Sequence, residues 1–463
     1  MNNIFTYPRE KFETAGLDKK MITALISKHR AVEVERLRKN KAYYDGAHAI
    51  QGSKRQQGAP NQKPVCNHAR DISDTASGYF MGSPISYESK DKETDIAKLT
   101  GAFSRADVDD VDQDNALLLS IYGCSYEYIY AAEDAAELKV KNLNPENTFI
   151  VYDDTIEHKE LFGVYYYVKK DDVNNLESYV ATVCTDTYIY NFVLYPFAPQ
   201  GVEPLQSKEP EKHNLGYVPI VEYKNNKFCI GDFEQQIGLI DAYNTLMADR
   251  VNDKEQFIDA ILVIYGQILG DTEEETEEAQ KKLAKKKLLE LDEGAKAEYL
   301  TRTFDEAGVE TLRKALKEDI YTFSHVPNLT DENFAGNSSG VAMEYKLLGL
   351  EMLTKIKERY YRKALKKRLK IFCHFLSLKA IEVDASLIAP TFSRALPKNL
   401  TELANMIATL SDSVSLKTLI KLLPFVEDPE AEVEAVEQEK EKASARQQKV
   451  FSQTVNEPPD DDE

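Results

Sequence analysis

The 463-residue sequence lacks tryptophan altogether, and it has no apolar run of the roughly 18 to 20 residues that a membrane-spanning helix requires. Its polar start, MNNIFTYPREKFE, also lacks the charged-then-apolar order of a secretory signal peptide, which favours a protein that stays in a cytosol. The aromatic content is instead tyrosine-rich, with 26 tyrosines and 19 phenylalanines, as is typical of strands and interfaces. A chain of this length is expected to divide into several subdomains.

Cysteine and histidine are too few and too dispersed to predict a metal centre. The five cysteines form no CxxC pair, and they are Cys66, Cys124, Cys184, Cys229 and Cys373. His68 follows Cys66 at a short interval, but no second pair lies at the spacing of zinc ligands. We therefore expect unpaired structural thiols, no metal site and no cofactor.

Positive charge is scarce, because 78 acidic residues face 58 basic ones and give a formal net charge of −20. This balance opposes a protein that wraps nucleic acid through a broad basic surface. The exception is one segment, 355–370, in which nine basic residues meet a single acid: Lys355, Lys357, Arg359, Arg362, Lys363, Lys366, Lys367, Arg368 and Lys370. Two interpretations stay open, a solvated helix face and a surface that contacts DNA or an acidic neighbouring subunit.

The sequence also lacks a convincing catalytic motif. Gly336–Gly340 fits the G-x-S-x-G pattern of a hydrolase nucleophile elbow with Ser338 at its centre. An elbow needs a buried strand before the serine, and the preceding TDENFA cannot supply one. A phosphate-binding loop would need Lys-Ser or Lys-Thr after Gly340, which is also missing. We expect no enzyme, with a hydrolase using Ser338 as the least favoured alternative.

Periodicity predicts an α+β fold that is mainly helical. Apolar residues recur at helical spacing within the first forty residues, over 65–80 and over 114–124. Short segments rich in Tyr, Val and Phe follow, and they predict antiparallel strands at 125–130, 137–143, 148–152, 161–169, 179–183 and 187–194. The segment 217–224 predicts a further strand, which Pro219 places at a sheet edge.

The second half predicts two helices around a small insert. Residues 231–266 read as one long helix with Asp232 as its cap, and 305–323 as a returning helix. Between them, 272–287 predicts a charged helix, while 288–291 and 297–300 predict a hairpin, in a module too small to bury its own core. A soft polar loop at 333–341 then leads to a long helix at 342–380, two short helices within 399–423 broken at Ser411-Asp412, and a charge-rich tail expected to be disordered.

Several of these segments together resemble the portal proteins of tailed bacteriophages, the head-to-tail connectors, in the branch typical of long-tailed phages of Gram-positive hosts. The segments that carry the resemblance are YYDGAHAI at 43–50, GYFMGSPI at 78–85, residues 218–223, GDFEQQIGLIDAYNTLMADRVNDKEQFIDAILV from Gly231, ENFAGNSSGVAMEYKLLGLE from Glu332 and LPFVEDPE at 423–430. They extend over most of the chain.

The resemblance implies a portal architecture, assembled as a ring of about twelve subunits around a DNA channel. The implied parts are a wing of helices and antiparallel strands (1–230), a first stem helix (231–266), a clip (267–304), a second stem helix (305–324), a tunnel loop region (325–343), a long wing helix (344–384), a helical crown (385–430) and a charged tail (431–463).

The resemblance also implies site residues and partners. The channel-facing tunnel loop would present Asn333, Phe334, Asn337, Ser338 and Ser339, and the clip would use Leu288, Leu289, Leu291, Tyr299 and Leu300. The implied partners are further copies of the chain, double-stranded DNA, the large terminase subunit, major capsid and scaffold proteins, and head-completion adaptors. The implied location is the portal vertex of the virion, after assembly in the host cytoplasm. A cytosolic helical scaffold or adaptor without a channel is the alternative.

Overall fold

The chain forms two compact units in a computed structural model, Met1–Ala395 and Leu396–Glu463. The structure describes residues 5–55, 59–91, 94–132, 137–171, 176–196, 205–206, 208–257, 261–265, 272–286, 294, 296–300, 305–329, 340–394, 400–420, 422–423, 426, 432–440 and 442. Of the helices within these ranges, none is both long and apolar enough to cross a bilayer. The fold is α+β with antiparallel pairing prevailing, as the sequence predicts.

The first unit begins with the predicted helices. After α1 (Arg9–Ala15), α2 (Lys19–His29), the π-helical turn η1 (Arg30–Val34) and α3 (Glu35–Tyr44) continue as one rod. Asp18 caps α2 by accepting from the Lys20 amide at 2.9 Å. The rod ends at Asp45-Gly46, where Gly46 has a φ of 89° that favours glycine. The short turn η2 (Ala49–Gly52), α4 (His68–Met81), α5 (Ala97–Arg105) and α6 (Val108–Tyr122) follow.

The predicted strands belong to two mainly antiparallel sheets. The larger has the order β1-β5-β6-β7-β8-β10, with β9 pairing β8 and β1 running parallel to β5. Its strands are β1 (Phe5–Tyr7), β5 (Thr148–Asp153), β6 (Glu160–Asp171), β7 (Leu176–Cys184), β8 (Tyr188–Leu194), β9 (Leu205–Gln206) and β10 (Glu211–Lys212). The smaller sheet has the order β11-β3-β4, with β3 (Cys124–Ala131), β4 (Leu138–Leu143) and β11 (Ile220–Lys224). β11 lies at its edge, as Pro219 predicts.

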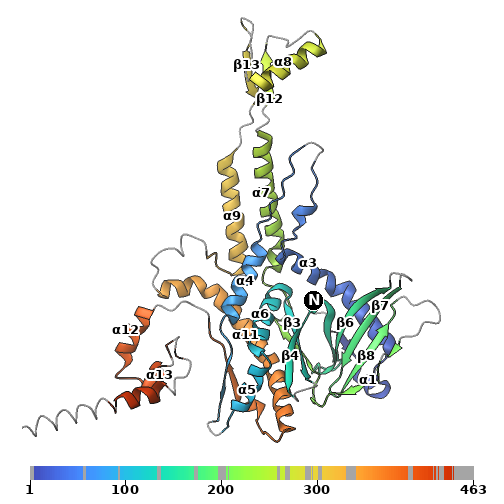
Figure 1. The fold of residues 1–463 in the computed structure, drawn as a ribbon, viewed down its shortest axis with the longest axis vertical. Helices are drawn as coiled ribbons and strands as arrows, with labels where there is room; N and C mark the ends of the chain where they lie inside the picture. Colours follow the sequence, from blue (N-terminus) through green and yellow to red (C-terminus); the bar gives the residue numbers. More distant parts are fainter. Residues whose placement is uncertain are drawn as a thin grey trace, which may run out of the picture. The chain divides into compact units, whose positions relative to one another are not determined.

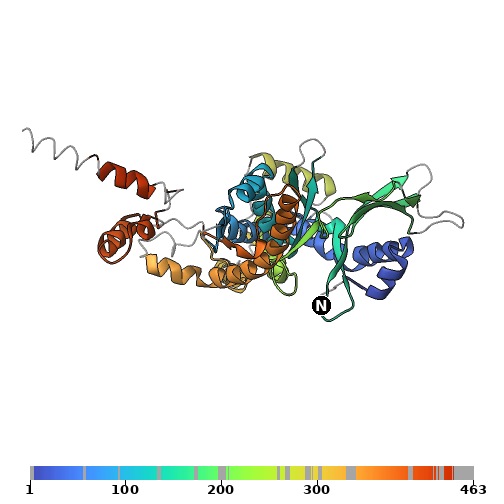
Figure 2. The same ribbon diagram turned by 90° about the horizontal axis from the view of Figure 1, so that it is seen from below.

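Two of the hydrophobic cores in the described part of this unit contain most of its buried apolar side chains. One lies between the larger sheet and the N-terminal helices, and it includes Ile22, Ile26 and Phe162. Figure 2 shows these helices packed along one face of the curved sheet. The second core joins α4, α5 and α6 to the long helix α11 (Gly340–Ser377), through residues such as Phe80 and Leu365. Burial of each such side chain stabilises the fold by about 1.5 to 3 kcal/mol.

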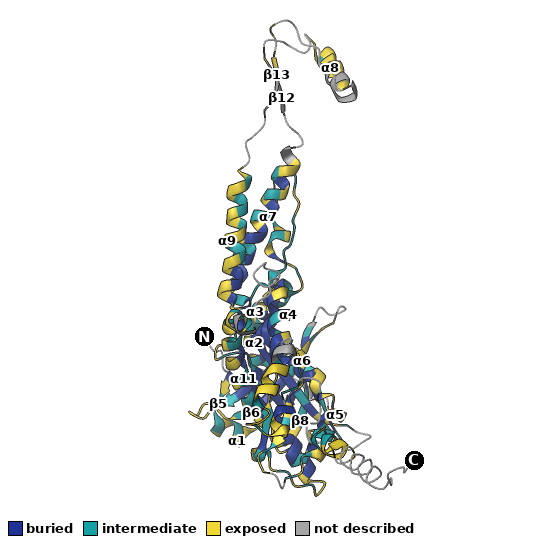
Figure 3. Ribbon diagram, turned by 90° about the vertical axis from the view of Figure 1, so that its left-hand side faces the viewer, coloured by how far each residue is buried: buried dark blue, intermediate teal, exposed yellow. Residues whose placement is uncertain are grey.

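Two antiparallel helices, α7 (Ile237–Phe257) and α9 (Glu306–Ser324), lie side by side and project from the rest of the unit (Figures 1 and 3). The prediction of one helix over 231–266 is wrong at both ends. A short 3-10 turn, η4 (Glu234–Gln236), precedes α7, and Ile261–Tyr265 forms the strand β12. Five consecutive apolar residues, ILVIY, three of them β-branched, favour a strand over an exposed helix turn.

The small insert beyond α7 contains α8 (Glu273–Lys286) and β13 (Lys296–Leu300). α8 is the predicted charged helix. β13 pairs with β12, with Ile261 opposite Leu300 and Tyr265 opposite Lys296. The predicted hairpin strand at 288–291 lies outside the described residues. The insert is therefore closed by strands from its two ends.

The C-terminal boundaries also differ from the prediction. Residues 385–391, expected to open the crown, form η5 (Ala385–Leu387) and β14 (Ile388–Thr391). β14 pairs with β2 (Ser86–Ser89), and its Ile388 is buried in a core of the first unit. In the second unit, α12 (Leu400–Leu410) and α13 (Leu416–Ile420) flank the predicted break at Ser411-Asp412. Residues 432–440 are helical, so disorder is the wrong prediction for that stretch.

Candidate functional site

The helix pair α7–α9 is held together by charged and polar contacts along its length. Arg250 of α7 forms an ion pair with Glu306 and contacts Glu310 at 2.9 Å, near the outer end of the pair. Arg313 donates to the Tyr243 hydroxyl at 3.1 Å and pairs with Glu310 at 2.6 Å. These partners follow the antiparallel register. The two helices therefore present the strand pair β12–β13 at their far end (Figure 1).

The predicted clip and tunnel-loop residues are only partly described. Tyr299 and Leu300 lie on β13, opposite Leu262 and Ile261. The clip residues Leu288, Leu289 and Leu291, and the tunnel-loop residues Asn333, Phe334, Asn337, Ser338 and Ser339, lie outside the described residues. The described flanks show that this loop joins the end of α9 to the start of α11.

The basic helix segment 355–370 lies within α11, and much of its charge points into the protein. The Lys357 side chain is 4% exposed and forms an ion pair with Asp232, while Lys367 pairs with Glu160. Arg362 pairs with Glu358 at 2.7 Å, and Lys355 with Glu351 at 3.7 Å. The remaining exposed cations are Arg359, Lys363, Lys366 and Lys370. The interpretation of the whole segment as an external contact surface is therefore wrong for its inward-facing residues.

Arg368 is the centre of a fully buried polar cluster. It donates to Asp112 at 2.6 and 2.9 Å and to Glu127 at 3.0 and 3.1 Å. Tyr361 donates to Asp112 at 2.5 Å and Tyr223 donates to Glu127 at 2.9 Å. The two carboxylates raise the pKa of Arg368 against the opposing effect of burial. The cluster fixes α11 against α6, β3 and β11.

Asp232 links α11 to the base of the projecting helices. Its carboxylate accepts hydrogen bonds from Ser120 at 2.6 Å and Asn225 at 2.9 Å, besides the ion pair with Lys357. The predicted helix cap is therefore wrong, since these partners occupy the Asp232 carboxylate and the helical turn η4 has Phe233 at its N-cap, with no side-chain cap. One carboxylate thus ties α6, the loop before α7 and α11 together.

Sequence reasoning did not identify the acidic partners of the basic segment, which are Asp112, Glu127, Glu160 and Asp232. For Asp112 a signal exists, because it falls on the same helical face as Val108, Ala116 and Leu119. A charged residue on an apolar face needs a partner of opposite charge. Arg368, the partner of Asp112, lies far along the chain, and no sequence pattern identifies it as the partner.

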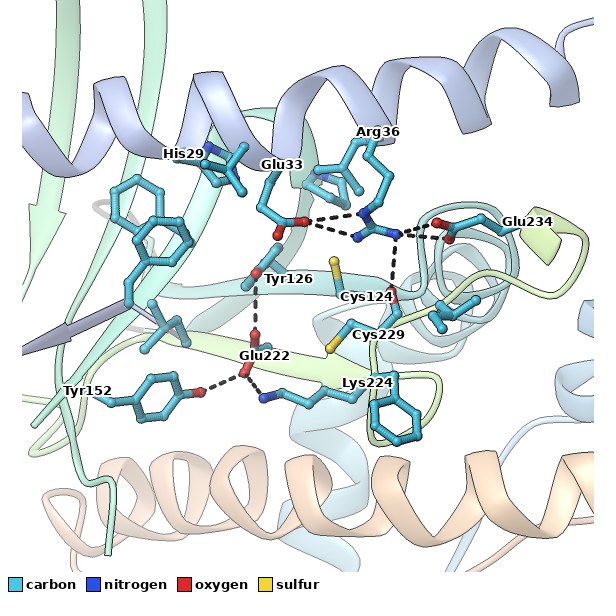
Figure 4. Close-up of a pocket in the computed structure, with 18 residues that line it drawn as sticks. His29, Glu33, Arg36, Cys124, Tyr126, Tyr152, Glu222, Lys224, Cys229 and Glu234 are labelled. Carbon is cyan, nitrogen blue, oxygen red and sulfur yellow. Dashed lines mark hydrogen bonds and ion pairs between the residues drawn. The ribbon is translucent and has the colours of Figure 1, made fainter. Parts of the chain in front are cut away.

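A cavity of about 640 Å³ lies between the rod α2–η1–α3 and strands β3, β5 and β11 (Figure 4). On one side Arg36 pairs with Glu33 at 3.1 Å and with Glu234 at 2.8 Å. On the other side Glu222 accepts from Tyr152 at 2.6 Å and pairs with Lys224 at 3.0 Å. Its charges are matched by neighbours, which is typical of a structural polar interior.

Cys124 and Cys229 also line this cavity (Figure 4). All five cysteines are unpaired, as predicted. Burial raises the pKa of the Cys229 thiol to about 12, and burial raises the pKa of the Cys124 thiol well above its ordinary value. Neither thiol is activated as a nucleophile, because only the thiolate reacts. Within the described ranges, no group of three or more His, Cys, Asp or Glu side chains could hold a metal ion.

Stability is expected to fall between pH 6.5 and 4 because of His29 in the cavity wall. Burial lowers its pKa from 6.5 to about 4, and its Nδ1 lies 2.9 Å from the Tyr166 hydroxyl. The unfolded chain therefore binds the proton more readily in this window, so stability is complete above about pH 6.5 and is lost by about 3 kcal/mol on acidification to about pH 4. Urea unfolding over this range should show the loss, and His29→Gln should reduce its slope but not abolish it, because burial also lowers the pKa of His68 to about 4. An unchanged slope in His29→Gln would contradict the assignment.

The comparisons with known proteins agree with one another on the family. The model of the phage portal protein family "SPP1 Gp6-like" matches residues 24–446. A portal protein of Bacillus phage SPP1 is 23% identical over 391 residues, which cover 79% of this chain and 74% of the relative. A portal protein of Clostridium phage phiCD119 is 25% identical over 318 residues, covering 65% and 67%.

Among solved structures, a chain from the neck of an empty GTA particle aligns with a TM-score of 0.46 and 11% identity, over 76% of this chain and 89% of that one. Phage portal proteins are structural, non-enzymatic components of the virion at the capsid, and the prediction that this chain is not an enzyme is confirmed by the family. Because the family model matches nearly the whole length of the chain, the chain belongs to the SPP1 Gp6-like family of phage portal proteins.

Proposed function

We propose that copies of this chain form a ring of about twelve subunits at one capsid vertex, through which double-stranded DNA is packaged and ejected. The family match over residues 24–446 carries this proposal. The projecting pair α7–α9, with a small strand pair at its far end, supports it. The insert is too small to bury a core of its own, and in a ring it would bury apolar surface against the inserts of neighbouring copies.

The parts of the ring then follow from the described elements. We assign α7 and α9 to the stem, the β12–α8–β13 insert to the clip, the segment between α9 and α11 to the tunnel loop, and the helices from Leu400 onward to the crown. The clip would receive the large terminase subunit during packaging and head-completion adaptors afterwards. Capsid and scaffold proteins would surround the wing, with assembly in the host cytoplasm.

Net acidity suits a channel that DNA must pass without being held. Tight binding through counterion release would stop the duplex, whereas a neutral or acidic wall neither grips nor strongly attracts it. The charge of −20 per chain, together with the inward pairing of Lys357 and Arg368, supports such a wall. Fixed positive charge would be confined to particular places.

The first experiment is the mass of the purified protein in solution, followed by negative-stain images of the large species. Rings of about twelve subunits with a central hole are expected. A well-defined compact dimer at every concentration tested would contradict the ring and favour a scaffold or adaptor without a channel.

A bulky side chain in the tunnel loop should reduce DNA packaging by about tenfold or more while leaving the ring intact, because narrowing the channel obstructs the duplex. The variants are Asn333→Trp and Ser338→Trp, measured as DNA-filled heads in a complemented infection. Ile156→Trp is the matched control, since Ile156 is fully exposed in a turn of the larger sheet. Loss of ring assembly in the loop variants would count against the tunnel-loop assignment.

A further inference from the structure

A second cavity, of about 720 Å³, lies beside the C-terminal half of α11, against the η5–β14 segment. The basic residues that line it are Lys90, Arg362, Lys366, Lys370 and His374. Its apolar wall includes Leu369, Val383 and Ile388. The cavity therefore combines a positively charged side with an apolar side, unlike the charge-matched cavity of Figure 4.

The basic residues form a row. Arg362, Lys366, Lys370 and His374 follow one another every four residues on α11, a rise of about 6 Å per step. Lys90 comes from the turn after β2 and is held by a hydrogen bond to the Ser386 carbonyl at 3.0 Å. Within this row Arg362 is paired with Glu358, whereas Lys366 and Lys370 are neighbouring positive charges one helical turn apart, which is suited to a linear polyanion.

The negative charge in the cavity wall is small and already engaged. Asp384 is the single carboxylate among the described residues that line it. It accepts from both the amide and the hydroxyl of Ser386 at 2.8 Å. No ion pair found in the described part of the chain involves Lys366 or Lys370. These lysines thus differ from Lys357, which has its own buried acid.

An aromatic side chain lies next to the cations. Tyr217 is 37% exposed and meets the His374 ring edge-to-face, with 6.4 Å between the ring centroids. Gly216 makes this approach possible, because its φ is +70° and a Cβ there would lie 3.1 Å from the His374 Nε2 atom. A basic groove with an exposed aromatic side chain is the composition of sites that hold a nucleic-acid backbone and its bases.

We propose that this cavity binds the phosphodiester backbone of DNA, with Lys366 and Lys370 as its principal phosphate contacts and Tyr217 beside them. The aromatic face and the evenly spaced row favour nucleic acid over an acidic protein segment. The proposal rests on the proposed function for the identity of its ligand. It places one fixed positive site on an otherwise acidic chain, where DNA is contacted apart from the tunnel loop.

The test compares two charge reversals on the same helix. K366E/K370E alters the cavity, whereas R359E/K363E alters exposed cations outside it with the same spacing and the same change in net charge. Binding of a fluorescein-labelled single strand and of a duplex, each about 20 nucleotides long, is measured by anisotropy at several salt concentrations. K366E/K370E should weaken binding about tenfold or more and lower the salt slope, and R359E/K363E about twofold or less. K366Q/K370Q removes the two positive charges without reversing them. It should therefore also weaken DNA binding, but by less than K366E/K370E does.

Each outcome decides a point. Preference of the wild type for the single strand or the duplex identifies which form of the backbone fits the cavity. Equal weakening in both reversals would overturn the proposal in favour of diffuse attraction, and so would displacement of DNA by poly-glutamate at equal charge concentration, which would indicate an acidic protein segment. The mass in solution of each variant separates this test from the proposed function. If the chain binds DNA through this cavity but forms no ring, the proposed ring is refuted and the DNA-binding site stands. If rings form and K366E/K370E binds DNA as tightly as the wild type, the DNA-binding site alone is refuted.

Discussion

Replacing Arg368 by methionine should lower the free energy of unfolding by about 3 to 5 kcal/mol, because the change leaves Asp112 and Glu127 buried without their counter-ion. The Arg368 side chain is 0% exposed, so water cannot enter to solvate the two carboxylates without opening the core. Tyr223 and Tyr361 donate to the same carboxylates. With tryptophan absent, tyrosine fluorescence and circular dichroism during urea unfolding report the loss.

Lys363→Ala is the matched control for Arg368→Met, since Lys363 is exposed on the same helix and should change the stability by no more than about 0.5 kcal/mol. Neutralising the acids in Arg368→Met with Asp112→Asn and Glu127→Gln should recover part of the stability. If Arg368→Met unfolds like Lys363→Ala, the buried cluster does not hold α11 to α6, β3 and β11.

The second large effect is expected at Gly123, which ends α6 and leads into β3. Its φ is +81°, and a Cβ there would lie 2.1 Å from the Cys229 carbonyl oxygen. An alanine would meet both the left-handed backbone and a rigid backbone group, so Gly123→Ala should lower the stability by about 3 kcal/mol or more. Thermal unfolding of the purified variant measures the effect.

Gly78→Ala provides a control of opposite sign. Gly78 lies within α4, is exposed, and a Cβ there would meet nothing within 4 Å. Alanine should raise the stability by about 0.5 to 1 kcal/mol through its higher helix propensity. A similar loss in both variants would mean that the close approach of Gly123 to Cys229 does not govern the packing at this turn.

The elements that the sequence predicts well are those with strong local patterns. Tyrosine- and valine-rich runs bounded by turns became β3 to β8, and helical periodicity marked α4, α9 and α11. The helix prediction failed at Ile261–Tyr265, where the same apolar spacing suits a helix or a strand. The strand is stabilised by pairing with Lys296–Leu300, which is remote in the chain.

The basic segment shows why site prediction from sequence stops short. Its nine cations were visible as a group, yet composition cannot say which of them face inward. Lys357 and Arg368 find acids on other elements, whereas Lys366 and Lys370 line a cavity whose opposite wall comes from residues 383–390. Only the packing of α11 against α6, β11 and β14 separates these roles.

The inward pairing of these cations has a consequence for how copies of the chain meet. Lys357, Lys367 and Arg368 are engaged with the chain's own acids, so they cannot neutralise an approaching copy. Two copies of a chain with an excess of twenty negative charges repel one another over the Debye length, about 8 Å at physiological ionic strength. This repulsion opposes indiscriminate aggregation. Close approach of two copies therefore requires screening ions and short-range surface complementarity.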